Sequence, residues 1–172
     1  MKYEPIPTER ILAIDPISKG FGFVVLESDP LQLVDWGTST CRRTDDSLGE
    51  TVRMLLARYR PTAIVLEAPS TCRSHTRRLA LTASVAIIAD AVQDVCPIRL
   101  IERDKVVVAF VSLGAFNKRQ RVELLMERFP ELAPKVPPPR FIWQSEDARW
   151  AVFDALALAV CLLEASRQSG PV

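Results

Sequence analysis

Three acidic side chains stand where the sequence is otherwise apolar. Asp15 and Glu67 each follow a run of four apolar residues, and Asp154 stands in a segment rich in Ala, Leu and Val. An ionised carboxylate in such surroundings is costly unless a cation or a hydrogen-bond donor meets it. Carboxylate oxygens are the ligands that Mg²⁺ prefers in proteins. The three positions therefore predict a site at which Asp15, Glu67 and Asp154 hold divalent metal.

A fourth acid precedes Asp154 by seven residues. The pattern from about 145 to 167 predicts one long helix, on which Asp147 lies two turns before Asp154 and on nearly the same face. Glu146 points about 80° away from Asp147. Acids in the first turn of a helix also complement its dipole. Two interpretations of Asp147 therefore stay open, a fourth metal ligand or a residue that only starts the helix.

The segments around these acids are predicted to alternate between strands and helices. Strands are expected at about 10–15, 21–27, 31–38, 62–69 and 97–101, and helices at about 47–59, 77–94, 104–114, 117–126 and 145–167. The first three strands are close enough in sequence to form an antiparallel meander. The helix at 77–94 is apolar nearly all round, so we expect it to be well buried. The proline-rich residues 129–142 predict an irregular loop.

Basic residues gather in two places although the net charge is only +1. The first group lies around His75, and the second lies at the start of the amphipathic helix predicted at about 117–126. They consist of Arg73, Arg77 and Arg78, and of Lys118, Arg119 and Arg121. Local basic clusters on a neutral protein can bind a polyanion. The alternative is that each group is simply a solvated face.

Composition narrows the class of protein. The chain has 172 residues, 48% of them hydrophobic and 25% charged, which suits one compact domain over 1–172. No apolar run has the length of a membrane span, and residues 1–5 lack the apolar core of a signal peptide. The four cysteines are widely spaced with no CxxC pair, so we expect reduced thiols, no structural zinc and a cytoplasmic location.

The order of these features resembles a known family. A strand ending in Asp15, a meander, a strand ending in Glu67, a basic segment and the late sequence Asp154-Ala155-Leu156-Ala157 resemble the RuvC-like Holliday-junction resolvases of the ribonuclease H superfamily. Lys118 stands where that family carries a Lys before a helix. The resemblance implies an α/β, ribonuclease H-like fold with a five-stranded mixed sheet flanked by helices. Ile17 departs from the family's Gly, and Ala151 replaces its second acid or His.

The resemblance implies a nuclease that resolves four-way DNA junctions as a homodimer, with no nucleotide cofactor. Hydrolysis with two Mg²⁺ ions about 4 Å apart needs one bridging carboxylate and others that flank it. We expect Asp15 to bridge and Glu67 and Asp154 to flank, with Asp147 as the candidate fourth catalytic and metal-binding acid. Mn²⁺ is the expected substitute ion, and no His, Cys or Ser nucleophile is required.

Three other functions were weighed against this one. An actin-like ATPase shares the same core but needs two lobes and a second glycine-rich loop, for which 172 residues and 6 glycines leave no room. A non-catalytic module that binds branched DNA or an assembly partner is favoured by Ala151 and opposed by the three acids. An RNA-processing nuclease stays open, because RuvC-like folds include ribosomal-RNA maturation proteins.

Overall fold

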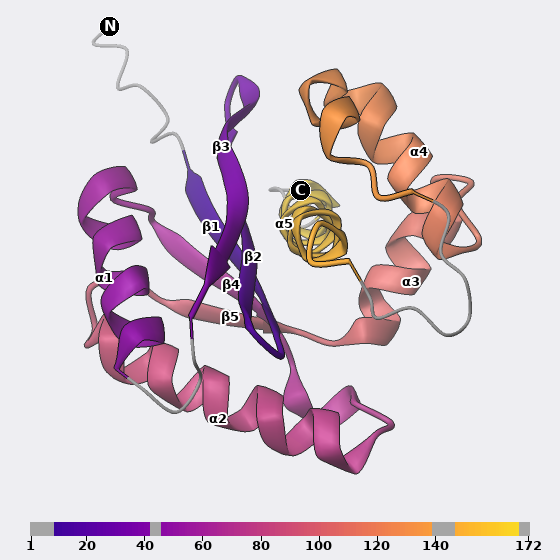
Figure 1. Ribbon diagram of the computed structural model, residues 1–172. Helices are drawn as coiled ribbons and strands as arrows, with labels where there is room; N and C mark the ends of the chain where they lie inside the picture. Colours follow the sequence, from indigo (N-terminus) through magenta and orange to yellow (C-terminus); the bar gives the residue numbers. More distant parts are fainter. Residues whose placement is uncertain (1–8, 42–45, 139–146, 169–172) are drawn as a thin grey trace, which may run out of the picture.

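The computed structural model describes residues 9–41, 46–138 and 147–168. In this part of the chain a five-stranded sheet lies between two groups of helices (Figure 1). The strands are β1 (Arg10–Ile17), β2 (Gly20–Ser28), β3 (Leu31–Thr40), β4 (Ala63–Glu67) and β5 (Ile98–Ile101). The helices are α1 (Ser47–Tyr59), α2 (His75–Val92), α3 (Arg103–Ser112), α4 (Lys118–Arg128) and α5 (Trp150–Gln168), with short 3₁₀ helices η1 (Pro69–Thr71) and η2 (Pro130–Lys135).

The sheet is mixed, with the order β3-β2-β1-β4-β5. β1, β2 and β3 form an antiparallel meander. β4 runs parallel to β1, and β5 runs parallel to β4. The central strands β1 and β4 are therefore neighbours although about 50 residues separate them, and the predicted mixed sheet with its antiparallel first half is confirmed.

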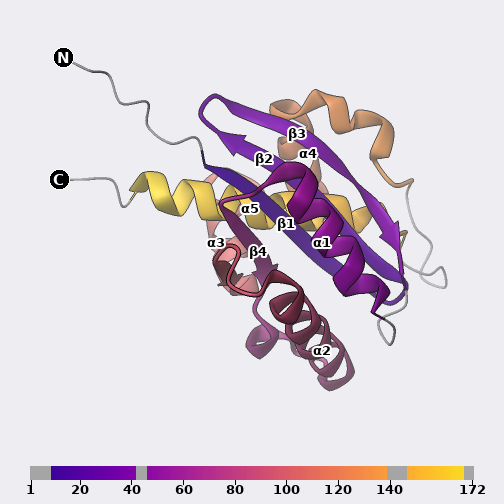
Figure 2. The ribbon, with the colours of Figure 1, turned by 90° about the vertical axis from the view of Figure 1, so that its left-hand side faces the viewer.

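Alternate residues of the central strands face two separate cores. In β1, Leu12 and Ile14 pack with α1 and α2, whereas Ile11 and Ala13 pack with α3, α4 and α5. Figures 1 and 2 show α1 and α2 on one side of the sheet and α5 across the other. Because successive strand side chains point to opposite faces, the position of a residue along β1 or β4 decides which group of helices it meets.

Helix α5 approaches the sheet closely at one glycine. A Cβ atom placed on Gly22 of β2 would lie 2.4 Å from the carbonyl carbon of Ala151 and 2.6 Å from its Cβ. Gly22 pairs with Asp15 across the β1–β2 ladder. The missing side chain at Gly22 therefore lets the first turn of α5 settle against the sheet beside Asp15.

Two predictions about helices are wrong. α2 is buried on one face only: Leu81, Ser84 and Ile88 are covered, but Leu79 is 57% exposed. The reason is that α2 packs on a single face of the sheet, and nothing in the described chain covers its outer side.

The last helix begins later than the sequence pattern indicates. It starts at Trp150, because the Asp147 carboxylate accepts the backbone N–H of Arg149 at 2.9 Å and folds the chain into a turn. Asp147 thus precedes the helix, and its predicted two-turn relation to Asp154 does not hold. Glu146 and residues 139–142 lie outside the described residues, while residues 130–135 form η2 instead of an irregular loop.

Gly22→Ala should destabilise the protein, because the new methyl group would collide with the backbone of α5. Overpacking of this kind costs about 1–3 kcal/mol, and we expect a fall in Tm of at least about 2 °C. The matched control is Gly49→Ala in α1, whose new Cβ would meet its nearest atom at an ordinary 3.6 Å. That change should leave Tm unchanged or raise it. Equal Tm values for the two variants would contradict the close packing.

Candidate active site

Asp15 and Glu67 lie side by side on the face of the sheet that α5 covers. Ala13 and Val65 are opposite each other in the β1–β4 ladder, and both belong to the core under α5. Two residues further along each strand, the same register and the same face bring Asp15 opposite Glu67. Both side chains are buried, with 4% and 6% of the residue surface exposed. The apolar runs before these acids are thus the strands that carry them into the interior.

Asp154 comes to the same place from the other side, on α5. That helix packs against β1, β2 and β4, and most of its residues from Ala151 to Leu163 are buried. Asp154, Asp15 and Glu67 line one small cavity together. The three acids named from the sequence therefore do converge, from β1, β4 and α5.

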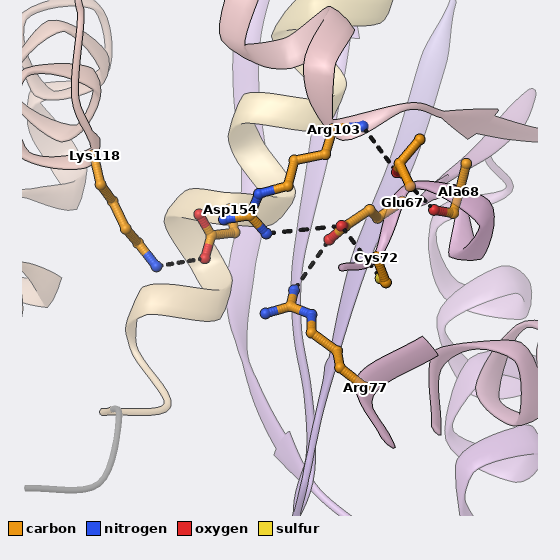
Figure 3. A network of polar contacts seen from close by, with 8 residues as sticks. Glu67, Ala68, Cys72, Arg77, Arg103, Lys118 and Asp154 are labelled. Atoms are coloured by element: carbon orange, nitrogen blue, oxygen red, sulfur yellow. Dashed lines mark hydrogen bonds and ion pairs between the residues drawn. The ribbon is translucent and has the colours of Figure 1, made fainter. Parts of the chain in front are cut away.

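Glu67 is surrounded by donors (Figure 3). Its Oε2 accepts a hydrogen bond from Nη2 of Arg77 at 3.0 Å, and its Oε1 lies 3.7 Å from Nη1 of Arg103. The Cys72 thiol also donates to Oε1, at 3.7 Å. Burial raises the pKa of this thiol, and the charge of Glu67 raises it further. Cys72 is therefore held as a neutral thiol.

Asp154 forms an ion pair with Lys118 at the start of α4. Nζ of Lys118 lies 2.8 Å from Oδ2 of Asp154 and 4.8 Å from the centre of the Trp150 ring. The Asn117 side chain caps α4 by accepting the N–H of Gln120. This cap fixes the helix start that presents Lys118 to the site.

Asp15 differs from the other two acids because nothing in the described chain neutralises it by contact. Its oxygens make no hydrogen bond or ion pair with the described residues, and it lines the cavity instead. Burial raises the pKa of the Asp15 carboxyl well above its usual range, and the charge of Asp154 raises it further. The charges of Arg77 and Lys118 act in the opposite direction. Asp15 is thus a buried acid that faces an open space.

Asp147 lies on the same open space but is engaged elsewhere. It lines a cavity of about 460 Å³ together with Asp15, Asp154 and Trp150. The Arg149 side chain binds both of its oxygens, with the shortest contact at 2.6 Å, and these hydrogen bonds lower the pKa of the Asp147 carboxyl. Ala151 contributes only a methyl group to this cavity.

The six predicted basic residues divide into two groups. Arg77 and Lys118 contact the acids, and Arg121 lines the small cavity and lies 5.6 Å from the Phe110 ring. Burial lowers the pKa of Arg121. Arg73, Arg78 and Arg119 are exposed, and Arg119 pairs with Glu123 on its own helix.

Arg103 is the residue that the sequence interpretation missed. It lies two residues after the end of β5, which runs parallel to β4, and Ile101 stands opposite Glu67 in that ladder. The carboxyl ends of parallel neighbours meet at one edge of a sheet, so a basic residue just after β5 could have been assigned to the site. Because Arg103 stands between Glu102 and Asp104, the sequence does not show it as part of a basic cluster.

Comparison with solved structures identifies the architecture. The chain superposes on RuvC of Thermus thermophilus in complex with a Holliday junction substrate, with a TM-score of 0.67 and 17% identity over 92% of this chain and 96% of that one. The fold is ribonuclease H-like. A second Thermus thermophilus RuvC structure gives the same TM-score at 16% identity, covering 93% of this chain and 97% of that one.

The ribonuclease H-like fold is also shared with a eukaryotic protein. Ydc2, the yeast mitochondrial Holliday junction resolvase, superposes with a TM-score of 0.65 and 16% identity over 96% of this chain and 82% of that one. No family model and no curated protein sequence matches this chain. Identities this low show a common fold.

The chemistry of these donors decides whether the site suits the Mg²⁺ ion that a ribonuclease H-like fold implies. Among the described residues, no three His, Cys, Asp or Glu side chains are arranged as a ready-made metal cluster. Glu67 already has a donor at each oxygen, but Asp15 has none, and Asp154 contacts Lys118 through Oδ2 alone. Hard oxygen ligands with open positions suit Mg²⁺, which keeps several of its own waters. Asp15 and Asp154 therefore fit a divalent ion.

Asp15→Asn should stabilise the metal-free protein, because the amide removes a buried charge. Because the Asp15 pKa is raised in the folded state, the contribution of this carboxyl to stability is fully present below its unfolded pKa of about 4 and is lost as the pH rises toward and through the folded pKa. In EDTA at neutral pH we expect the Tm of Asp15→Asn to exceed that of wild type by at least about 2 °C. This difference in Tm should grow as the pH rises from about 4.

The control for this prediction is Asp90→Asn on the exposed side of α2, where Asp90 makes only a 3.7 Å ion pair with Arg53. Its Tm should match wild type in EDTA, since exposed pairs contribute little. A Tm of Asp15→Asn at or below that of wild type would show that the Asp15 carboxylate is compensated inside the protein.

Proposed function

We propose that this chain is a metal-dependent endonuclease that cuts branched DNA, with four-way junctions as its substrate. One observation carries the proposal: three acids from β1, β4 and α5 meet on one face of a ribonuclease H-like sheet. The structures that share this fold include a resolvase bound to a Holliday junction. The proposal includes a single catalytic domain that works as a homodimer, because paired symmetric cuts need two sites related by a two-fold axis.

The chain's own residues have distinct roles in this proposal. Asp15 and Asp154 hold Mg²⁺, or Mn²⁺ in its place, with Asp147 beside the same cavity and Glu67 completing the acid cluster. The bound ion supplies a more acidic water and stabilises charge on the phosphate. Lys118 holds the Asp154 carboxylate in place through its ion pair. Hydrolysis adds water across one P–O bond: the water oxygen joins phosphorus, and the 3′ oxygen leaves with a proton.

DNA binding is assigned to the basic residues around the cluster. Arg73 and Arg77 line a second cavity of about 510 Å³ next to Glu67, and Arg78 and Arg119 are exposed. The outer face of α2, which includes the exposed Leu79, offers a surface for the second copy. None of the helices in the described residues is long and apolar enough to cross a membrane.

A non-catalytic module that binds branched DNA is the second candidate. It is favoured by the ion pairs that already occupy Glu67 and Asp154, and by Ala151 at the position of an expected fourth ligand. A protein that has lost the reaction would keep the fold and the basic surface. The two candidates differ in a single measurable property, cleavage that depends on divalent metal.

The test is incubation of labelled four-way junction, duplex, single strand and RNA with the protein in Mg²⁺, Mn²⁺ or EDTA. We expect metal-dependent cuts in the junction. Asp15→Asn, Glu67→Gln and Asp154→Asn should each slow cleavage by at least about 100-fold, because several kcal/mol of charge stabilisation are lost. Asp147→Asn should slow it by about tenfold, since Asp147 is held by Arg149.

Glu50→Gln, which changes an exposed acid in the first turn of α1, is the control and should cut at the wild-type rate. Junction binding without cleavage in any metal would support the non-catalytic module instead. Preferential cleavage of RNA would identify RNA as the substrate of the same metal-dependent hydrolysis.

Removal of two exposed arginines should weaken DNA binding in a salt-dependent way. Arg73→Gln with Arg78→Gln should lower junction affinity and reduce the slope of log K against log salt by about 2, because each phosphate contact releases about one counterion. The matched control is Arg53→Gln with Arg58→Gln on α1, which removes the same charge away from the site. Identical slopes for the two double variants, measured by fluorescence anisotropy, would show that Arg73 and Arg78 form only a solvated face.

A further inference from the structure

Glu67 is the one acid of the cluster whose two oxygens both face guanidinium groups. Arg77 approaches Oε2 to 3.0 Å from α2, and Arg103 approaches Oε1 to 3.7 Å from the start of α3. Figure 3 shows the two arginines reaching Glu67 from opposite sides, while Lys118 turns toward Asp154. The chain itself therefore neutralises Glu67, in contrast to Asp15, which has no such contact among the described residues.

The backbone fixes both arginines before any ligand arrives. The N–H of Arg103 donates to Oγ1 of Thr71 at 3.3 Å, and the Thr71 hydroxyl donates to the carbonyl of Ala68 at 3.0 Å. The Ser74 side chain caps α2 by accepting the N–H of Arg77 at 3.4 Å. The loop that follows β4 thus ties the starts of α2 and α3 to the strand that carries Glu67. The backbones of Arg77 and Arg103 are therefore anchored close to Glu67.

The space between the acids is narrow and lined by positive charge. Three acids and three arginines line a cavity of about 30 Å³ there. They are Asp15, Glu67, Asp154, Arg77, Arg103 and Arg121. A second divalent ion beside Glu67 would therefore sit among guanidinium groups of like charge. Among the described residues, three acids and one arginine line the cavity of about 460 Å³ beside Asp15 and Asp154, which has room for an ion with its waters.

The opposite side of the cluster has the chemistry of a phosphate site. Arg73, Arg77 and Arg103 line the 510 Å³ cavity there, together with Thr71, Ser74 and the carboxylate of Asp104. A guanidinium group is planar and always charged, and it can donate two parallel hydrogen bonds to a phosphate. Arg77 lines both of the large cavities and the small one. It therefore stands where a phosphodiester would meet the acid cluster.

We propose that Glu67 positions the Arg77–Arg103 pair and is not a metal ligand, that the chain holds one divalent ion on Asp15 and Asp154, and that the arginine pair contacts the phosphate to be cut. The pair then supplies the positive charge that a second ion would bring in a two-metal site. This inference rests on the proposed function and assigns a role within it to each of these residues. Glu67 is a positioning residue, and the two arginines touch the substrate.

The test counts bound Mn²⁺ without DNA, by isothermal titration calorimetry and by electron paramagnetic resonance of the free ion. Wild type and Glu67→Gln should each bind one ion per chain, and Asp15→Asn should bind none. The double variant Arg77→Gln with Arg103→Gln should bind two, because Glu67 is released to act as a ligand. The control double variant, Arg53→Gln with Arg58→Gln, should bind one.

Two ions on the wild type, or none on Glu67→Gln, would overturn the proposal while leaving a metal-dependent nuclease intact. No ion on the wild type would instead overturn the metal-dependent function itself. Glu67→Gln keeps the shape of the side chain and an acceptor for one of the two arginines, so this arm holds even if the double arginine variant fails to fold.

The phosphate contact is tested separately, by junction binding in EDTA. Arg77→Gln with Arg103→Gln should bind at least about tenfold more weakly than the control double variant, since charge-assisted phosphate contacts are lost. Equal affinities would remove the arginine pair from the DNA interface.

Discussion

Burial of the Asp15 carboxylate is the constraint on which the rest of the site depends. The strand that holds Asp15 is enclosed on both faces, and two further acids approach from β4 and α5. Three close negative charges in a low dielectric would oppose folding. The outer two are matched by Arg77, Arg103 and Lys118, so that the remaining charge is concentrated on one carboxylate beside a cavity.

This distribution of charge gives the site two unlike sides. Carboxylates that could still accept a metal ion lie toward Asp147 and Trp150. The guanidinium groups that pair with Glu67 lie toward Thr71 and Arg73. A cation and an anion can therefore bind next to each other with little rearrangement, because the donors and acceptors are already oriented. Arg77 belongs to both sides, and the carboxylates of Glu67 and Asp15 raise its pKa against the effect of burial.

The sequence predicted best where one physical rule dominates. Apolar runs of four residues followed by an acid located β1 and β4, and strand alternation then required both acids to share a face. The sequence predicted the start of the last helix less well, because a side chain there competes with the helical pattern. The residues around Asp147 favour a helix, but its carboxylate accepts the N–H of Arg149 in an Asx-type turn, so α5 begins only at Trp150. The sequence interpretation missed Arg103. This residue reaches the site because β5 pairs in parallel with β4, and no local sequence pattern encodes that pairing.

The position of α5 has a consequence for the order in which the site can form during synthesis. Asp15 emerges from the ribosome early, and the face of β1 that carries it stays hydrated until α5, which ends the described chain, docks on the sheet. The cost of dehydrating Asp15 therefore falls on the docking of α5, whose apolar residues are then available to offset it. A nascent or truncated chain that lacks α5 would have a solvated acid at position 15 and no enclosed site. Competence to bind metal would then appear only after the whole domain has been made.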